Sequence, residues 1–432
     1  MVALIVFGAF IVLMLVGVPV IVAFGISTLA GLAYAGFAAD LSQLYLFPQQ
    51  ILEGVDAPGL LALPFFVLAG NLMNLIGVTE RIVRLASALV GHLRAGMAQV
   101  NVVGSLFFGG ITGSAIADCA GIGKLVIRPM RERGYPADFA AALTVAASVI
   151  GPTMWPSVPL LIYAFSASVS IERVFLAGIG PGILIVASLM IYNRLVAIRF
   201  NVPLTPRPPL REIAKAAFDG IWAIFAPLII IGSIIFGVAT ATEAGVVACA
   251  YVLILGLAYR TLTWAKLAEA FADTVLLTAG VMLILGVSTV MSWLFAFDQV
   301  PQNLAQSVLA LTDNRWVFLA LILVFFLILG TILEPIPAMV ILIPVLLPLI
   351  DHYGIDRVHF GLVMVYGLLL GIVTPPVGIA LFIVTRIAAI PFEAVCIAVL
   401  PFLIPLIIVL VAIAFVPDVV LWVPNLVLGP AR

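Results

Sequence analysis

Four short segments of this chain place hydroxyl-bearing, acidic and small residues, together with prolines, inside otherwise apolar sequence. The first half contains GGITGSAIADCAGIG (Gly109–Gly123) and SVIGPTMWPSVP (Ser148–Pro159). The second half contains GTILEPIPA (Gly330–Ala338) and GIVTPPVG (Gly371–Gly378). Polar groups are costly in an apolar environment, and at membrane depth they mark functional sites. The four segments therefore predict one binding site that is made twice.

The prolines of these segments indicate how they would bind an ion. Pro152, Pro156 and Pro159 fall within eight residues, so a helix through them must unwind. Unwound backbone exposes carbonyl oxygens, and the ends of the resulting half-helices carry partial charge. Such a site binds a hard cation such as Na⁺ without a cluster of carboxylates. The candidate Na⁺ ligands are Thr112, Ser114, Gly151 and Thr153 in the first half, and Gly330, Thr331, Thr374 and the backbone of Val377 in the second.

A packing role is the alternative for each of these residues, because small residues and hydroxyls commonly hold membrane helices together. Three acids also have more than one interpretation. Asp118 could ligate a cation, carry a proton or cap a helix N-terminus, and Glu334 beside Pro335 could do the same. Glu243 in ATATEAG is predicted to be structural, at the start of a helix that follows a threonine N-cap.

The composition predicts an all-α polytopic membrane protein. Of the 432 residues 65% are hydrophobic and 9% are charged, and the mean hydropathy is +1.33. These fractions lie far outside those of soluble domains. Apolar stretches long enough to cross a bilayer recur from Val2 to Val416, and their length indicates helices rather than a barrel. With a formal net charge of −1, the chain gives no indication of a nucleic-acid partner or an organic cofactor.

The apolar stretches also predict the elements that position the four segments. We expect spans near 2–16, 18–36, 60–77, 136–166, 174–193, 221–237, 241–259, 274–296, 360–388 and 394–415. The spans at 136–166 and 360–388 contain the prolines and are predicted to be broken helices. The stretches at about 100–123 and 318–348 have a polar or proline-rich middle, so we expect re-entrant hairpins there.

Basic residues predict the orientation of the chain. If the N-terminus lies outside, the basic residues that fall on the outer side are Arg173, Arg315, Arg357 and Arg432, out of 19 Lys and Arg. The positive-inside rule favours this orientation and places both termini in the periplasm. The amphipathic segment Gly77–Met97 is predicted to lie along the membrane interface, with Pro301–Leu311 as its uncharged counterpart.

An internal repeat relates the two halves of the chain. Pairs of residues that differ by 220 in number match at the breaks and polar sites, namely Ser114 and Glu334, Gly134 and Gly354, and Pro156 and Pro376. We expect a first repeat at 1–200, a cytoplasmic linker at 201–216 and a second repeat at 217–432. Five crossings in each half would invert the second copy. The alternative is a chance likeness between apolar sequences of similar composition.

The same alignment predicts the substrate site. Its candidate residues are Trp155, Pro156 and Ser157 in the first broken helix, and Thr374, Pro375 and Pro376 in the second. Trp155 aligns with Pro375, and both are expected to face the cavity between the hairpins. An indole would narrow that cavity and offer one N–H donor to a carboxylate or sulfonate. The alternative is a ring that packs against lipid or neighbouring helices.

Longer motifs resemble a known family in order and spacing across nearly the whole chain. They are LPFFVLAGNLM (Leu63–Met73), TGSAIADCAGIG (Thr112–Gly123), RGYPADFAAALTVAASVIGP (Arg133–Pro152), TEAGVVACAYVLILG (Thr242–Gly256), the second hairpin, and LLGIVTPPVGIALFI (Leu369–Ile383). The family is the large membrane subunit of TRAP (tripartite ATP-independent periplasmic) transporters, the DctM-like proteins.

The resemblance implies an elevator-type importer in the bacterial inner membrane that uses Na⁺ to take up a small organic anion. It also implies two partners, a small four-helix membrane subunit and a soluble periplasmic substrate-binding protein. The hairpins and broken helices would form the moving transport domain. Two departures from the family pattern, Trp155 in place of a proline and Glu334 in place of an aspartate, bear on the identity of the substrate.

Three other functions are alternatives to this one. A stand-alone Na⁺/dicarboxylate symporter of similar architecture would bind its substrate without a delivery protein. An intramembrane enzyme is disfavoured because the chain has neither HExxH nor GxSxG, and a channel because repeated broken helices indicate occlusion rather than a continuous pore. No GxxxxGK[ST] motif is present, so we expect an ion gradient to supply the energy.

Overall fold

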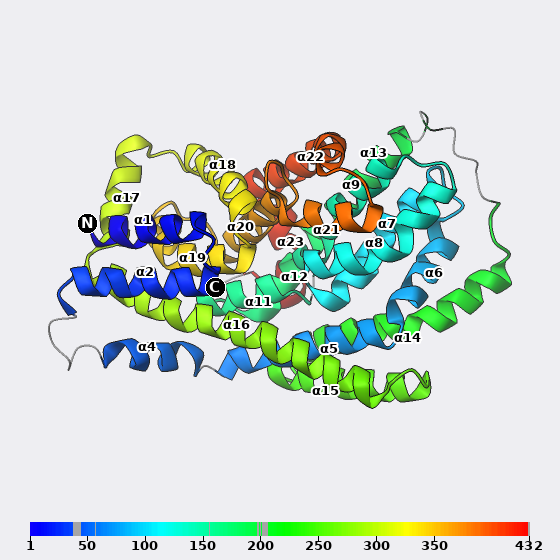
Figure 1. Ribbon diagram of the computed structural model, residues 1–432, viewed down its shortest axis with the longest axis horizontal. Coiled ribbons are helices and arrows are strands. Elements are labelled where there is room, and N and C mark those ends of the chain that lie inside the picture. The colour runs from blue at the N-terminus through cyan, green and yellow to red at the C-terminus, as the bar shows by residue number, and fades with distance from the viewer. Residues whose placement is uncertain are drawn as a thin grey trace.

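The computed structural model describes residues 1–37, 45–56, 58–154, 156–196, 198, 200 and 206–430. Within these ranges every regular element is a helix, which confirms the all-α fold (Figure 1). Three sequence predictions fall wholly or partly outside the described residues: the Trp155 site, the first five residues of the linker predicted at 201–216, and the outward-facing Arg432.

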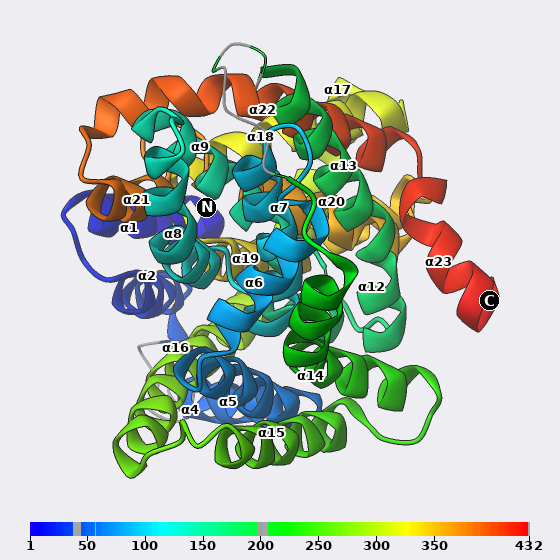
Figure 2. The same cartoon turned by 90° about the vertical axis from the view of Figure 1, so that its right-hand side faces the viewer.

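One group of helices forms a layer along one side of the molecule. In Figures 1 and 2 α4, α5, α15 and α16 lie together at the lower edge, with α14 beside them. The helices of this layer are α4 (Leu46–Val55), α5 (Ala62–Leu75), α14 (Leu210–Ile235), α15 (Ala241–Ala258) and α16 (Trp264–Phe297). Helices α1 (Val2–Leu15) and α2 (Val20–Tyr34) pack on each other, and α2 packs on α16. We call α4, α5, α14, α15 and α16 the scaffold layer.

The other group contains the predicted hairpins and broken helices. The first hairpin is α7 (Gly96–Thr112) and α8 (Ala115–Glu132), and the second is α18 (Arg315–Ile332) and α19 (Pro335–His352). The broken helices are α9 (Ala137–Ser148), α10 (Ile150–Thr153) and α11 (Val158–Ser166), and α20 (Arg357–Ile372) and α21 (Ile379–Ala388). The remaining helices are α6 (Val78–Val90), α12 (Ile171–Ala177), α13 (Ile179–Val196), α17 (Val300–Leu311), α22 (Phe392–Phe415), α23 (Asp418–Leu428) and the 3₁₀ turn η2 (Pro58–Leu61).

Element bounds repeat along the chain in the way the sequence repeat predicts. Ala115 begins α8 and Pro335 begins α19, while Glu132 and His352 end the same two helices. The two sets also interlock: α21 packs on α8 and α9, and α11 packs on α19 and α20. Each broken helix is therefore completed by the hairpin of the other half. The division of the chain at 200 and 217 stays a prediction.

Each hairpin crosses its own broken helix at a pair of glycines. A Cβ atom built on Gly151 would lie closer than 3.0 Å to the Cα atom of Gly109, and one built on Gly371 would lie that close to Gly330. No side chain fits at such a distance, so the two backbones are in direct contact. The same glycine-to-glycine helix crossing therefore occurs beside the break in each half.

Both broken helices are confirmed. The helix at 137–153 and α11 meet at 42°, where three prolines interrupt the chain. In the second half α20 ends at Ile372 and α21 begins at Ile379, with Pro375 and Pro376 between them. A proline removes a backbone donor and clashes with the preceding turn, which explains why the helices stop there.

Seven described helices are long and apolar enough to cross a membrane, or nine if each of two bent pairs counts as one span. The predicted spans at 2–16 and 18–36 correspond to α1 and α2, of 14 and 15 residues. At 1.5 Å per residue each measures only about 21–23 Å, less than a hydrocarbon core of about 30 Å. The predicted interfacial segments correspond to α6 and α17.

Candidate functional site

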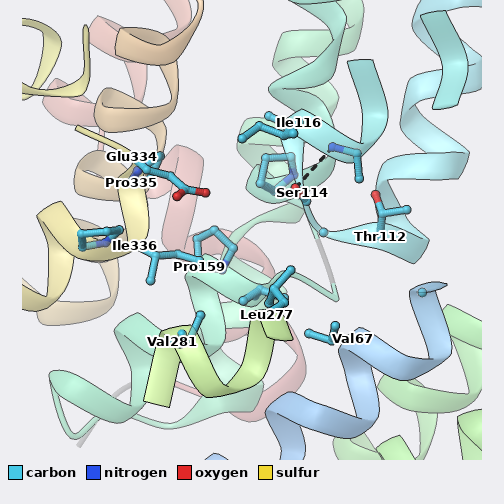
Figure 3. Close-up of a pocket in the computed structure, with 18 of the residues that line it drawn as sticks. Val67, Thr112, Ser114, Ile116, Pro159, Leu277, Val281, Glu334, Pro335 and Ile336 are labelled. Atoms are coloured by element: carbon cyan, nitrogen blue, oxygen red, sulfur yellow. Dashed lines mark hydrogen bonds between the residues drawn. The ribbon is translucent and has the colours of Figure 1, made fainter. Parts of the chain in front are cut away.

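A cavity of about 290 Å³ lies where the tips of the two hairpins face each other (Figure 3). The first broken helix and the scaffold layer close its remaining sides. The lining residues come from the first tip (112–117), the second tip (334–337), the broken helices (Pro152, Val158, Pro159, Leu369, Ile372), α2 (Ile21), α5 (Val67, Gly70, Asn71, Asn74) and α16 (Leu276, Leu277, Gly280, Val281, Ile284). The two halves therefore meet around a partly open cavity, as the sequence predicts.

The first tip is uncharged and rich in hydrogen-bond donors. Ser114 is the N-cap of α8, and its Oγ accepts a hydrogen bond from the backbone N–H of Ala117 at 3.4 Å (Figure 3). The other N–H groups of the first turn, on Ala115 and Ile116, have no partner within the helix. Both residues line the cavity. The partial positive charge of the helix start is thus directed at the cavity.

The turn before this helix requires glycine. Gly113 has a φ of +59°, and a Cβ atom on it would lie 3.0 Å from the carbonyl oxygen of Pro156. The tip therefore rests directly against the break of the first broken helix.

The second tip carries a carboxylate and few donors. Glu334 occupies the N-cap position of α19, but its side chain makes no capping hydrogen bond. Pro335 and Pro337 occupy the first turn and have no N–H group. Glu334 is exposed to the cavity, and Figure 3 shows its carboxylate pointing into the space between the tips. Among the described residues that line the cavity, Glu334 is the only ionisable one.

The scaffold supplies polar groups that the sequence analysis did not single out. Asn71 and Asn74 of α5 line the cavity. The Nδ2 of Asn71 donates to the Oγ1 of Thr274 at 3.1 Å, and the Oδ1 of Asn74 accepts from the hydroxyl of Thr79 at 3.2 Å. These bonds hold both amides in place. The available signal was an asparagine inside the apolar motif LPFFVLAGNLM.

A second, much smaller cavity of about 10 Å³ lies behind the first tip, and Thr112, Pro156 and Ser157 are among its lining residues. The Oγ1 of Thr112 is buried and has no hydrogen-bond partner in the described chain. The hydroxyl of Ser157 donates to the carbonyl of Pro152 at 2.6 Å and accepts from the N–H of Leu160 at 3.3 Å. The space is close to the minimum for one water molecule. Three predicted site residues therefore meet at a space that holds at most one water-sized group.

The remaining hydroxyls among the candidate Na⁺ ligands donate to backbone carbonyls three or four residues earlier in the chain. Thr153 donates to the carbonyl of Val149 at 2.7 Å, Thr331 to Ile328 at 2.7 Å and Thr374 to Leu370 at 2.6 Å. None of the three donors lines either of the two cavities. Gly151 and Gly330 lie at the helix crossings. Cation binding by these five residues stays a prediction, and the contacts present are those of packing.

The second break lies apart from the cavity lining. Pro375, Pro376 and Val377 do not line it, and the side chain of Val377 is 40% exposed. Their predicted contact with substrate or ion is untested, as is that of Trp155.

Two of the three acids have definite structural surroundings. Asp118 is 1% exposed on α8, and neither carboxylate oxygen meets hydrogen-bond geometry in the described chain, although the Ser105 hydroxyl lies beside it. Ser114, not Asp118, caps this helix. Glu243 forms a capping box with Thr240, whose backbone N–H and hydroxyl each donate to its Oε2 at 2.8 Å. The predicted place of Glu243, at a helix start that follows a threonine N-cap, is confirmed.

Two hairpins and two broken helices that line a cavity against a layer of scaffold helices, in a chain this apolar, define a membrane transport protein. A family model confirms the class and narrows it: residues 7–419 match the DctM component of tripartite ATP-independent periplasmic transporters. The chain belongs to this family of large permeases.

Known proteins resemble the chain over most of its length. The sialic acid TRAP transporter large permease protein SiaM of Vibrio cholerae is 43% identical over 382 residues, which cover 88% of this chain and 90% of SiaM. The isethionate TRAP transporter permease protein DctMQ of Oleidesulfovibrio alaskensis is 35% identical and covers 96% of this chain, with 65% of its own length matched. The crystal structure of the YdaH transporter of Alcanivorax borkumensis has a TM-score of 0.62 at 15% identity, covering 87% of this chain and 88% of its own, and supports the fold.

Proposed function

We propose that this permease imports a small organic anion, a carboxylate or a sulfonate, together with Na⁺. The observation that carries the proposal is the cavity between the hairpin tips, with a row of free N–H groups on one side and a single carboxylate on the other. The first side suits an anion and the second suits a cation. The names of relatives that carry sialic acid and isethionate support a carboxylate or sulfonate substrate.

Sodium is the coupling ion that we infer. Among the described residues no three His, Cys, Asp or Glu side chains cluster as they would around a transition metal. Carbonyl and hydroxyl oxygens at the breaks, the unpartnered Oγ1 of Thr112 and the carboxylate of Glu334 are hard ligands of the kind that Na⁺ accepts. Each net positive charge that moves inward gains about 2.3 kcal/mol per 100 mV.

We further propose an elevator mechanism, in which the two hairpins and broken helices move as a body against the scaffold layer. The interlocking of α21 with α8 and of α11 with α19 supports a single moving body. The protein would lie in the inner membrane with both termini in the periplasm. A small membrane subunit and a periplasmic binding protein would complete the transporter.

Uptake into proteoliposomes tests the proposal. The reconstituted complex should accumulate a radiolabelled organic anion only with an inward Na⁺ gradient and an added binding protein. Uptake that persists with K⁺ in place of Na⁺ would refute Na⁺ coupling. Uptake from bulk solution without any binding protein would instead favour a stand-alone Na⁺/dicarboxylate symporter.

A further inference from the structure

A second large cavity, of about 500 Å³, shares no residue with the cavity between the hairpin tips. It lies between the end of α6, the turn after α8 and the start of α14, and we call it the basic cleft. Figures 1 and 2 show α6 and α14 side by side, and the two helices pack on each other. Its lining residues are Arg84, Ser87, Ala88, Gly91, His92, Arg133, Pro206, Arg207, Pro208, Pro209, Glu212 and Ala216.

Three arginines from three separate elements converge on the basic cleft. Arg84 comes from α6, Arg133 from the end of α8 and Arg207 from the segment before α14. In the described part of the chain none of them forms a salt bridge, and Glu212 is the single acid in the lining. Guanidinium groups match the geometry of phosphate oxygens and bind them through paired hydrogen bonds.

Two further groups in the basic cleft favour an anion. The Nδ1 of His92 is buried and has no hydrogen-bond partner in the part of the chain that the structure describes. The 26-residue helix α14 begins here, since Pro209 is its N-cap and provides no side-chain hydrogen bond to the first turn. The N–H groups of that turn thus add partial positive charge to the charge of the arginines.

From this geometry we infer that the basic cleft binds the phosphate headgroup of an anionic phospholipid. The elements that form it also carry exposed apolar side chains, on Leu89 and Leu93 at the end of α6 and on Leu210 and Phe218 of α14. A phosphate with acyl chains would use both the arginines and this apolar surface, whereas a free phosphate would use only the arginines. Basic pockets between membrane helices bind acidic headgroups in this way.

The ligand would join parts of the protein that belong to different helix groups. Arg84 and Arg207 lie on the side of α6 and α14, while Arg133 follows the first hairpin. A bound headgroup would therefore hold the end of the hairpin against the start of the scaffold helix α14.

The test uses the full-length purified chain in phosphatidylcholine nanodiscs that contain a small, graded fraction of phosphatidylglycerol. Native mass spectrometry measures how much phosphatidylglycerol each variant retains. We expect Arg84→Gln, Arg133→Gln and Arg207→Gln each to weaken retention roughly tenfold, the loss typical of one charged hydrogen bond. Arg211→Gln removes the same charge from the start of α14 but does not line the cleft, and it should retain lipid within about twofold of the unmodified chain.

The outcomes separate the possible sources of the phosphate. Unchanged retention in all three variants, or an equal loss in Arg211→Gln, would overturn the inference. Competition by millimolar inorganic phosphate that depends on the same arginines, without selective retention of phosphatidylglycerol, would overturn the assignment to a lipid. Helix content by circular dichroism for each variant confirms that a loss of lipid does not reflect unfolding.

Discussion

The two hairpin tips occupy equivalent places in the two halves, yet they differ in charge and in hydrogen-bonding groups. The first tip is capped by Ser114 and presents free N–H groups from the start of α8. The second begins α19 with Glu334 and two prolines, so it presents a carboxylate and keeps only the N–H of Ile336 as a free donor in its first turn. The backbone plan is shared, and the difference lies in four or five side chains. A duplicated fold can thus supply opposite electrostatic preferences on the two sides of one cavity.

The backbone arrangement that the two halves share depends on the glycine crossings. Disrupting one crossing should have the largest effect on stability and uptake. In Gly371→Ala the new Cβ would overlap the backbone of Gly330. Overpacking of this kind costs about 1–3 kcal/mol in an ordinary core, and more where backbone cannot move aside. We expect a lower melting temperature in detergent and loss of uptake.

A glycine in open space provides the control for this substitution. Gly232 lies inside α14 with no atom within 4 Å of a built Cβ, so Gly232→Ala should keep or raise the melting temperature. Equal melting temperatures for Gly371→Ala and Gly232→Ala would show that the crossing is looser than the structure indicates. Gly151→Ala should behave like Gly371→Ala if the two halves are equivalent at this point.

Removal of the charge from the second tip should have the next largest effect, on the binding of Na⁺. Glu334→Gln keeps the shape of the side chain and removes its charge. A unit charge about 4 Å from a cation contributes about 1–4 kcal/mol between bulk water and a partly dry site. We therefore expect the Na⁺ concentration for half-maximal uptake to rise roughly tenfold.

Glu243→Gln makes the same change of charge in an acid that caps α15 outside the cavity. It should leave the Na⁺ requirement unaltered. If Glu334→Gln also leaves it unaltered, the proposed difference between the tips has no role in ion binding.

Removal of the N-cap of the first tip should lower the stability of the protein and leave its Na⁺ requirement unchanged. Ser114→Ala removes the acceptor for the N–H of Ala117, at a cost of about 1 kcal/mol for a typical N-cap. The melting temperature should fall by a few degrees, as it should for Thr263→Ala at the N-cap of α16. A tenfold change in the Na⁺ requirement of Ser114→Ala would contradict this prediction and would make the hydroxyl an ion ligand.

Adding one hydrogen-bond donor to the second tip should have the smallest effect, on the affinity for substrate. Pro337→Ala adds one backbone N–H to the first turn of α19, beside the cavity. We expect the substrate concentration for half-maximal uptake to fall about twofold, since one neutral hydrogen bond contributes about 0.5–1.5 kcal/mol. Pro344→Ala in the interior of the same helix is the control. A weaker response in Pro337→Ala than in this control would show that the tip does not approach the anion.

Local sequence chemistry was sufficient to predict the tips and breaks. Two residue pairs are recognisable helix starts, Gly113-Ser114 before α8 and Glu334-Pro335 at the start of α19. Prolines follow closely after the ends of α10 and α20. The capping box at Thr240 follows from residue types three positions apart. These features depend on a few neighbouring residues, which explains why they can be read from one sequence.

Long-range features could not be predicted in this way. The contribution of α5 and α16 to the cavity depends on contacts between segments about 200 residues apart, such as that of Asn71 with Thr274. Helix α16 begins ten residues before the predicted span at 274–296, because Lys266, Glu269 and Asp273 make its first turns polar. The bond from the hydroxyl of Thr374 to the carbonyl of Leu370 could not be predicted, because periodicity gives the face of a helix but not the neighbour that covers it.

The glycine crossings also set limits on gating. Where two backbones touch, the hairpin and the broken helix cannot separate without breaking the packing of the whole bundle. Each hairpin extends only a short length beyond its crossing, residues 110–114 in the first and 331–334 in the second. Four or five residues of helix measure about 6–8 Å. We expect a tip of that reach to admit or release only one small solute at a time by bending, and a larger opening to require displacement of the entire unit.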